Sequence, residues 1–309
     1  MIYIEPTNLC NLRCRFCPTG SNKPVGAKRG MMEWGLFLRV IDEIEKIGAP
    51  KVIGWYMMGE PLLHPRLFDM IRHAKQRLGD SVKHRVFTNG VLLNSGRINQ
   101  LVECELDLIR ISVEALSSDG YEEIAGKAID YEKFLRGIGS LYARRGTCHI
   151  EAKLVDVHLT DADKQKFKDD FGSIADELTI EGLFAVRPDV HDCRIETPPL
   201  EEFRGKQISH RICCPQPFYQ SAIRWDGKVI VCCADWMNDS LLGDLHTDSL
   251  TDIWCGKQLR NFHLMQLRGG RFTDKVCTGC GIPECAQDNI DAYRKTLIKR
   301  LENTPCQNC

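Results

Sequence analysis

The stretch Cys10-Asn-Leu-Arg-Cys14-Arg-Phe-Cys17 places three cysteines at C-x-x-x-C-x-x-C spacing, directly after the strand-like run Ile2–Ile4. Cysteine thiolates are the usual ligands of iron–sulfur clusters, and such a loop can hold three corners of a cubic 4Fe-4S cluster. The fourth iron then stays open to a substrate or cofactor. A zinc loop is the alternative, but zinc sites usually pair two-cysteine knuckles. The spacing therefore favours an open cluster after the first strand.

Strand-like runs alternate with amphipathic helical stretches from residue 1 to about residue 185. The expected strands are Ile2–Ile4, Val52–Met57, Arg85–Thr88, Leu108–Val113, Ile150–Val157 and Glu177–Ile180. The expected helices are Trp34–Ile47, Arg66–Leu78, Ser95–Glu103, Tyr131–Arg144 and Asp161–Phe171, with N-caps at Ser95 and Asp161. Because β/α units in series form parallel sheets, they predict an α/β fold with either an open barrel or a doubly wound sheet.

The C-terminal third has a different composition. Residues 187–204 carry three prolines and mixed charges without periodicity, which predicts a linker over residues 187–210. Asp226-Gly227 is expected to be the turn of a hairpin between residues 222–225 and 228–231. A helix is expected over Leu250–Leu267, and a last helix from about Asp288. We therefore expect a core over residues 1–186 and a smaller domain over residues 211–309.

Composition limits the classes of protein and partner. The 309-residue chain has a net charge of −1, which gives no general attraction to nucleic acid or to an anionic membrane. We find neither an export signal nor a run of about 18 apolar residues that would span a membrane. A cytoplasmic protein is expected. Sixteen cysteines would also fit a disulfide scaffold, but such scaffolds are usually small and exported, so metal or cluster ligation is favoured.

Polar residues also follow or end the second, third and fourth expected strands, just as the cysteine loop follows the first. They lie in Met58-Gly59-Glu60-Pro61, Thr88-Asn89-Gly90 and Ser112-Val113-Glu114, which follow or end the second, third and fourth expected strands. Ligands of parallel α/β proteins bind at the carboxyl ends of strands. Together with the loop, and with Phe16 before its third cysteine, these segments resemble the radical SAM superfamily. The resemblance implies a partial (β/α)6 TIM-like barrel that binds S-adenosylmethionine (SAM).

The resemblance also implies a role for each residue. The SAM-binding 4Fe-4S cluster would be held by Cys10, Cys14 and Cys17. SAM itself would meet the following residues: Phe16 near the adenine, Gly59 and Glu60 at the amino group, the strand ends with Thr88, Asn89, Ser112 and Glu114 at the ribose, and Lys153 at the carboxylate or on the substrate. Without the family, Asn89-Gly90 is a turn and Glu114 is a carboxylate at a helix start. Met58 departs from the glycine typical of the family, but backbone contacts remain available there.

A second group of cysteines lies in the C-terminal third. It resembles the ligands of an auxiliary 4Fe-4S cluster in the cysteine-rich twitch or SPASM extensions of radical SAM enzymes, which implies ligation by Cys214, Cys232, Cys277 and Cys280. The neighbours Cys213 and Cys233 leave the register open by one residue, and such a slip reverses a side chain on a strand. One auxiliary cluster is expected, because the spacing of the remaining candidates departs from the pattern for a further one: Cys285, Cys306 and Cys309.

The resemblance predicts an enzyme that cleaves SAM to a 5′-deoxyadenosyl radical and takes a hydrogen atom from a carbon of a sugar-like or aminoglycoside-like small molecule. An electron donor such as flavodoxin or ferredoxin is implied. Cys255 follows Ile253-Trp254, where asparagine is more usual; it is either a buried helix cap or a thiol that gives hydrogen to a substrate radical, as in radical SAM epimerases. We expect epimerisation with Cys255 as the donor. The alternatives are dehydrogenation of a secondary alcohol with the auxiliary cluster as electron acceptor, modification of a peptide, and electron transfer without catalysis.

Overall fold

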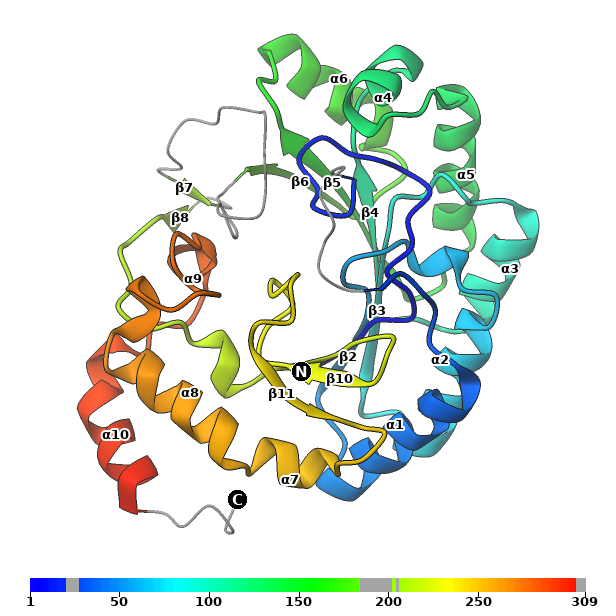
Figure 1. Cartoon of the computed structure of the whole chain (residues 1–309). Coiled ribbons are helices and arrows are strands. Elements are labelled where there is room, and N and C mark those ends of the chain that lie inside the picture. The colour runs from blue at the N-terminus through cyan, green and yellow to red at the C-terminus, as the bar shows by residue number, and fades with distance from the viewer. Residues whose placement is uncertain (21–27, 184–201, 204–205, 304–309) are drawn as a thin grey trace.

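The computed structural model describes residues 1–20, 28–183, 202–203 and 206–303, and a parallel sheet forms its core (Figure 1). Its first strands are β1 (Ile2–Ile4), β2 (Val52–Trp55), β3 (Lys83–Thr88), β4 (Leu108–Val113), β5 (His149–Asp156) and β6 (Glu177–Gly182). Each pairs in parallel with the next along the chain. A doubly wound sheet would reverse its strand order at a switch point, whereas a consecutive order is that of a barrel. The expected α/β fold is confirmed, as an open barrel.

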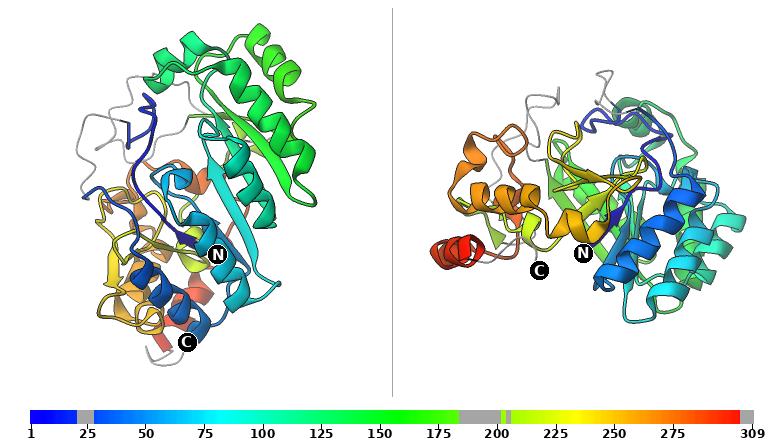
Figure 2. Two further views of the ribbon diagram at one scale, coloured as in Figure 1. Left: turned by 90° about the vertical axis from the view of Figure 1, so that its right-hand side faces the viewer. Right: turned by 60° about the horizontal axis from the view of Figure 1, so that its bottom comes forward.

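Helices cover the outer face of this sheet (Figures 1 and 2). They are α1 (Trp34–Ile47), α2 (Leu67–Leu78), α3 (Ser95–Glu103), α4 (Ser118–Ala125), α5 (Tyr131–Arg144) and α6 (Asp161–Phe171), with a short 3-10 helix η1 (Pro61–Leu63) before α2. Alternate strand residues such as Ile53, Val86 and Ile111 are fully buried in the core that these helices share. Removing such side chains from water stabilises the barrel by roughly 25 cal/mol per Å² of apolar surface.

The structure confirms the expected bounds of β1, β4, α1, α3, α5 and α6 and corrects others. Strand β2 ends at Trp55 rather than at Met57, and α4 is an element that the sequence did not reveal. The N-caps of α3 and α6 are Asn94 and Thr160, one residue before the expected ones, because their side-chain oxygens accept backbone N–H groups of the first turn. Local capping chemistry thus decides where each helix begins.

The C-terminal region continues the same sheet. Strand β9 (Ser221–Ile223) pairs in parallel with β1, and β10 (Lys228–Ile230) and β11 (Leu241–Asp244) follow in antiparallel pairing. Asp226-Gly227 lies at the expected turn between β9 and β10, with Gly227 at φ 81° in the left-handed region that glycine tolerates. The two expected domains therefore share one sheet, and most of the linker expected over residues 187–210 lies outside the described residues.

The rest of the extension is mainly helical. It contains η2 (Gln216–Phe218), α7 (Leu250–Trp254), α8 (Lys257–Leu267), η3 (Gly270–Phe272), α9 (Ile282–Cys285), η4 (Asp291–Tyr293) and α10 (Arg294–Asn303), and a two-stranded sheet of β7 (Glu202–Phe203) and β8 (Lys206–Gln207) precedes it. The helix expected over Leu250–Leu267 is broken because Gly256 has an extended backbone at φ −76° and ψ 161°. The last helix begins at Arg294 rather than near Asp288, and it buries no side chain. Within the described ranges, we find no helix with the length and apolar character needed to cross a bilayer.

A buried ion pair joins core and extension at the carboxyl ends of β1 and β9. The side chains of Glu5 and Arg224 are 0% and 1% exposed, and Nε of Arg224 lies 3.6 Å from Oε2 of Glu5. Glu5 also accepts the backbone N–H groups of Met58 and Trp225, each at 3.3 Å. Burial raises the pKa of Glu5, and Arg224 opposes that shift. The Glu5 carboxylate therefore links the end of β1 to Met58 after β2 and to the β9–β10 hairpin.

Candidate active site

Three thiols gather in the loop that follows β1. Cys10, Cys14 and Cys17 are not in disulfides, and they lie close enough that Cys17 contributes to raising the pKa of both other thiols. Burial is the larger cause, and it raises the pKa of Cys10 to about 12. Buried thiolates are stable only beside a positive centre such as a metal. The donor set therefore fits three corners of a 4Fe-4S cluster.

Helix α4, which was not expected from the sequence, contacts the cysteine loop. The backbone N–H groups of Arg13 and Arg15 donate to the carbonyl oxygens of Ala125 and Ile124, at 2.8 and 2.9 Å. On the other side, a Cβ on Gly20 would lie 2.5 Å from the carbonyl oxygen of Cys14, so the chain returns too closely for any larger residue. These contacts fix the backbone on both sides of Cys14, which orients the thiols before any ligand binds.

The strand end with Gly59 and Glu60 packs directly against this loop. A Cβ on Gly59 would lie 2.3 Å from the carbonyl oxygen of Thr7, and the N–H of Glu60 donates to the carbonyl oxygen of Leu9 at 2.8 Å. The buried Glu60 carboxylate accepts from the Thr88 hydroxyl at 2.6 Å and from the backbone N–H of Asn89 and Leu62, at 2.7 and 2.9 Å. Glu60 thus holds the ends of β2 and β3 together, and its contact with the SAM amino group stays a prediction.

The remaining predicted SAM contacts surround the same loop. Asn89 Nδ2 donates to Asn11 at 2.9 Å and lies 3.9 Å from Sγ of Cys10. Burial raises the pKa of Glu114 to about 7, with Lys153 opposing the shift. Among the described residues, Oε2 of Glu114 is buried without a hydrogen-bond partner, and the contact of Glu114 with SAM stays a prediction. Two more of the predicted contacts lie nearby: Ser112 pairs with Lys153 across β4 and β5, and the half-buried Phe16 packs on the core.

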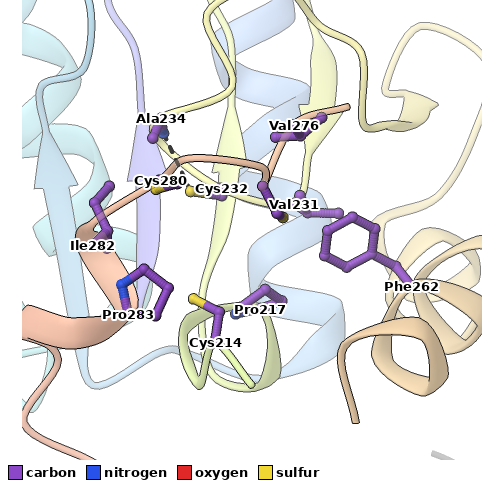
Figure 3. A pocket seen from close by; sticks show the side chains of 11 residues that line it. Cys214, Pro217, Val231, Cys232, Ala234, Phe262, Val276, Cys280, Ile282 and Pro283 are labelled. Atoms are coloured by element: carbon purple, nitrogen blue, oxygen red, sulfur yellow. Dashed lines mark hydrogen bonds between the residues drawn. The ribbon is translucent and has the colours of Figure 1, made fainter. Parts of the chain in front are cut away.

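Four cysteines of the extension line one hollow: Cys214, Cys232, Cys277 and Cys280 (Figure 3). The other lining side chains are mainly apolar, among them Phe262, Val276 and Pro283. Burial raises the pKa of Cys280 to about 12, and Cys232 adds to the shift. Within the described part of the chain, no three Cys, His, Asp or Glu side chains are arranged around a single metal ion. Four thiols around an apolar hollow fit a 4Fe-4S cluster better than one zinc ion.

Neither of the neighbouring cysteines, Cys213 and Cys233, lines the hollow. Sγ of Cys213 donates to the carbonyl oxygen of Cys214 at 3.6 Å, and Cys213 does not line the hollow. Cys233 packs against Tyr3, and its thiol is hydrogen-bonded to that of Cys232, which lowers the pKa of Cys233. The structure thus brings together the four predicted cysteines and keeps Cys213 and Cys233 out of the lining, while ligation itself stays a prediction.

The inner face of the barrel carries aromatic and charged side chains. The rings of Tyr56 and Phe87 stack with their centroids 3.6 Å apart, and the Arg110 guanidinium lies 4.3 Å from the Phe87 centroid. Arg110 also donates to Glu151 at 2.7 Å. The carboxylate of Glu181 lies 3.9 Å from Arg110 and 4.0 Å from Lys153. Arg110 and Glu151 alternate with buried apolar residues on β4 and β5, and Lys153 and Glu181 continue the same face on β5 and β6, so together they form a polar lumen on the side of the sheet away from the helices.

Comparison with known proteins supports the assignment of both groups of cysteines to iron–sulfur chemistry. Residues 4–152 match the family model of the radical SAM superfamily, and residues 213–281 match that of an iron–sulfur cluster-binding domain, SPASM. The chain belongs to the radical SAM superfamily. The two matches cover the cysteine loop with the first strands and the four-cysteine hollow.

Two relatives and one solved structure resemble most or all of the chain. The tungsten-containing aldehyde ferredoxin oxidoreductase cofactor-modifying protein of Pyrococcus furiosus is 25% identical over 100% of this chain and 94% of its own length. The S-adenosyl-L-methionine-dependent 2-deoxy-scyllo-inosamine dehydrogenase of Niallia circulans is 20% identical over 91% and 92%. The crystal structure of BtrN in complex with AdoMet and 2-DOIA superposes with a TM-score of 0.62, at 18% identity over 94% and 96% of the two chains. This last likeness supports the radical SAM fold.

The placement of Cys255 in this radical SAM enzyme does not favour its predicted role as hydrogen donor, which stays a prediction. Cys255 follows α7, and the adjacent Trp254 lines a cleft with Met1, Gly48 and Ser221. Those residues lie at the amino ends of β1, β2 and β9, whereas the cysteine loop follows the carboxyl end of β1. A hydrogen donor must touch the substrate radical, and this thiol follows a helix at the opposite end of the barrel. The sequence pattern suggested a catalytic thiol because it carries no information on where α7 packs.

The other cysteine candidates differ in placement. Cys285 on α9 is half-buried, and burial together with Glu284 and Glu181 raises the pKa of its thiol to about 11. Its thiol thus lies close enough to Glu181 on β6 for that carboxylate to contribute to the shift. Cys306 and Cys309 lie outside the described residues.

Several site residues had no sequence signal. Arg110, Glu151 and Glu181 were missed because charged residues on a strand ordinarily face solvent, and only the closure of the barrel turns them inward. Gln266 on α8, which contacts two of the four cysteines, was missed because a glutamine in a helix is unremarkable in a sequence.

Proposed function

We propose that this radical SAM enzyme removes a hydrogen atom from a carbon that bears a hydroxyl group, in a polar, carbohydrate-like small molecule, and oxidises the alcohol to a ketone. The observation that carries the proposal is the four-cysteine hollow of the extension, whose strands β9 and β10 continue the sheet that carries the cysteine loop. When bound, the two clusters and SAM supply a 5′-deoxyadenosyl radical and an electron acceptor. The protein residues must then hold the substrate, exclude water and take up one proton.

The lumen supports a polar small-molecule substrate. Glu181 forms ion pairs with Lys153 at 4.0 Å and with Arg110 at 3.9 Å. Charged groups of this kind can bind the hydroxyl or amino groups of a sugar-like ligand. The stacked Tyr56 and Phe87 offer an apolar surface to a ring face. Oxidation of an alcohol releases the hydroxyl proton, and we assign its uptake to the Glu181 carboxylate.

We expect Cys255→Ala to leave product formation unchanged, because the thiol lies at the amino ends of the strands. The comparison variant is Glu181→Gln, which should lower product formation on the order of 10²–10⁴-fold by removing the proton acceptor while 5′-deoxyadenosine is still released. Both are measured by product formation in deuterated water with the cluster-loaded enzyme. Loss of product in Cys255→Ala, together with deuterium at the reacting carbon of the wild-type product, would instead support epimerisation with a thiol donor.

The substrate test is a screen of deuterated polyols and aminocyclitols with the reduced enzyme and SAM. Transfer of deuterium into 5′-deoxyadenosine would identify the attacked carbon, and a ketone product would identify the oxidation. An external one-electron donor such as flavodoxin or ferredoxin is part of the proposal. An epimer without a ketone would reject the dehydrogenase assignment and retain the hydrogen abstraction.

A second candidate function is the modification of a cofactor of another enzyme. It is favoured by the full-length similarity to the cofactor-modifying protein of Pyrococcus furiosus, at 25% identity. A substrate that is itself protein-bound, or a short peptide, would fail to appear in a small-molecule screen. Copurification of an oxidoreductase or a precursor peptide, with deuterium transfer from it to 5′-deoxyadenosine, would favour this function.

A further inference from the structure

A buried amide bridges two of the four cysteines around the hollow. Gln266 lies on α8, between the apolar residues that this helix turns inward, and it is 0% exposed. Its Oε1 accepts the backbone N–H of Cys214 at 3.1 Å. Its Nε2 lies 3.0 Å from Sγ of Cys277. One side chain thus contacts a cysteine from the start of the extension and another from the loop after α8.

The orientation of this amide follows from its partners. A backbone N–H can only donate, so the group of Gln266 that faces Cys214 must be the oxygen. The NH₂ group then points at Cys277, and the sulfur of Cys277 has to accept. A thiolate accepts a hydrogen bond much better than a neutral thiol does. The hydrogen bond from Gln266 to Cys277 is therefore strongest when Cys277 is deprotonated and bound to metal.

Burying a glutamine without partners would be costly, at about 1–3 kcal/mol for each unsatisfied group. An apolar residue would fill the same place on α8 without that cost, as Leu267 does beside it. Retaining an amide here is consistent with a role that depends on its hydrogen bonds. Hydrogen bonds to the sulfurs are one of the factors that set the reduction potential of an iron–sulfur cluster.

We propose that Gln266 is a positioning residue for the auxiliary cluster, which fixes the Cys214 and Cys277 segments relative to each other and raises the cluster's reduction potential through its bond to Cys277. Reduction adds negative charge to the cluster and its sulfurs, so an N–H donor stabilises the reduced form more than the oxidised form. A higher potential makes the cluster a better acceptor for an electron from the substrate. The inference rests on the four-cysteine assignment and is independent of which substrate is oxidised.

The test is a potentiometric titration of the cluster-loaded enzyme, followed by electron paramagnetic resonance. In Gln266→Leu, we expect the reduction equilibrium of the auxiliary cluster to shift about tenfold toward the oxidised form, or about 59 mV for one electron. The potential of the SAM-binding cluster should not change. The matched control is Gln258→Leu, because Gln258 is exposed on the same helix. Equal auxiliary potentials in wild type and Gln266→Leu would overturn the proposal.

A second measurement uses the wild-type enzyme and does not depend on the stability of a variant. Protein labelled with ¹⁵N in glutamine side chains should show a weak ¹⁵N coupling to the reduced auxiliary cluster in pulsed spectra. Lack of any such coupling would overturn the inference. If iron analysis shows no auxiliary cluster at all, the four-cysteine assignment fails first, and with it both this proposal and the proposed oxidation. A ¹⁵N coupling in an enzyme that forms no ketone would reject the oxidation alone.

Discussion

Cys232→Ala should lower the iron content of the reconstituted enzyme from about eight to about four per chain, whereas Cys233→Ala should leave it near eight. The two residues are neighbours, but only Cys232 lines the hollow with the other three cysteines. Cys233 packs against Tyr3 and is hydrogen-bonded to Cys232, but it is not part of that lining. Substrate oxidation should be lost in Cys232→Ala, because no acceptor would remain for the second electron.

Iron and sulfide analysis of the anaerobically reconstituted variants checks this prediction. The pair is matched, since each variant removes one thiol from the same two-residue segment. Retention of about eight iron atoms in Cys232→Ala, with loss in Cys233→Ala, would move the ligand register by one residue. A wild-type value near four would remove the auxiliary cluster altogether.

Arg224→Met should destabilise the enzyme by about 3–5 kcal/mol, because it leaves the Glu5 carboxylate buried without its cation. The guanidinium and the carboxylate are 1% and 0% exposed, so water cannot replace the lost partner. The apparent unfolding midpoint should fall by roughly 5–15 °C, as followed by circular dichroism of the cluster-loaded enzyme. Since Glu5 also binds the backbone of Met58, the damage should extend to the SAM-binding strand ends.

The control is Arg72→Met, which removes a surface pair with Asp69 whose side chains are 42% and 49% exposed. Such pairs contribute about 0–1 kcal/mol, so the midpoint should hardly move. The double variant Glu5→Gln with Arg224→Met should recover much of the loss, because no unpaired charge stays buried. Equal stability of Arg224→Met and wild type would show that the pair does not hold the extension to the core.

Local patterns in the sequence predicted much of the fold. In Leu108–Val113 every second residue is apolar and buried, so the segment alone predicts a strand. In Trp34–Ile47 the apolar residues recur every three or four positions, so the segment alone predicts a helix. The helix α4 was missed because its eight residues bury only Tyr121 and Ala125 and show little apolar periodicity. The break at Gly256 was missed because a glycine within a helical pattern is often tolerated.

The candidate site was predicted less completely, because much of it depends on long-range packing. The three cysteines of the loop are close in sequence, so their spacing alone indicated a cluster. Arg110 and Glu151 meet only after β4 and β5 pair. The packing of the helix before Cys255 likewise has no local signal: the backbone N–H of Leu250 donates to Glu43, which docks α7 near the end of α1.

The most direct measurement is the release of 5′-deoxyadenosine by the anaerobically reconstituted, reduced protein mixed with SAM and candidate polar substrates. We expect release from the wild type, and none from a variant with alanine at Cys10, Cys14 and Cys17. Deuterium from a labelled carbinol carbon should appear in the 5′-deoxyadenosine formed. If the wild type binds both clusters but releases no 5′-deoxyadenosine with any substrate, the chain is an iron–sulfur protein without radical catalysis.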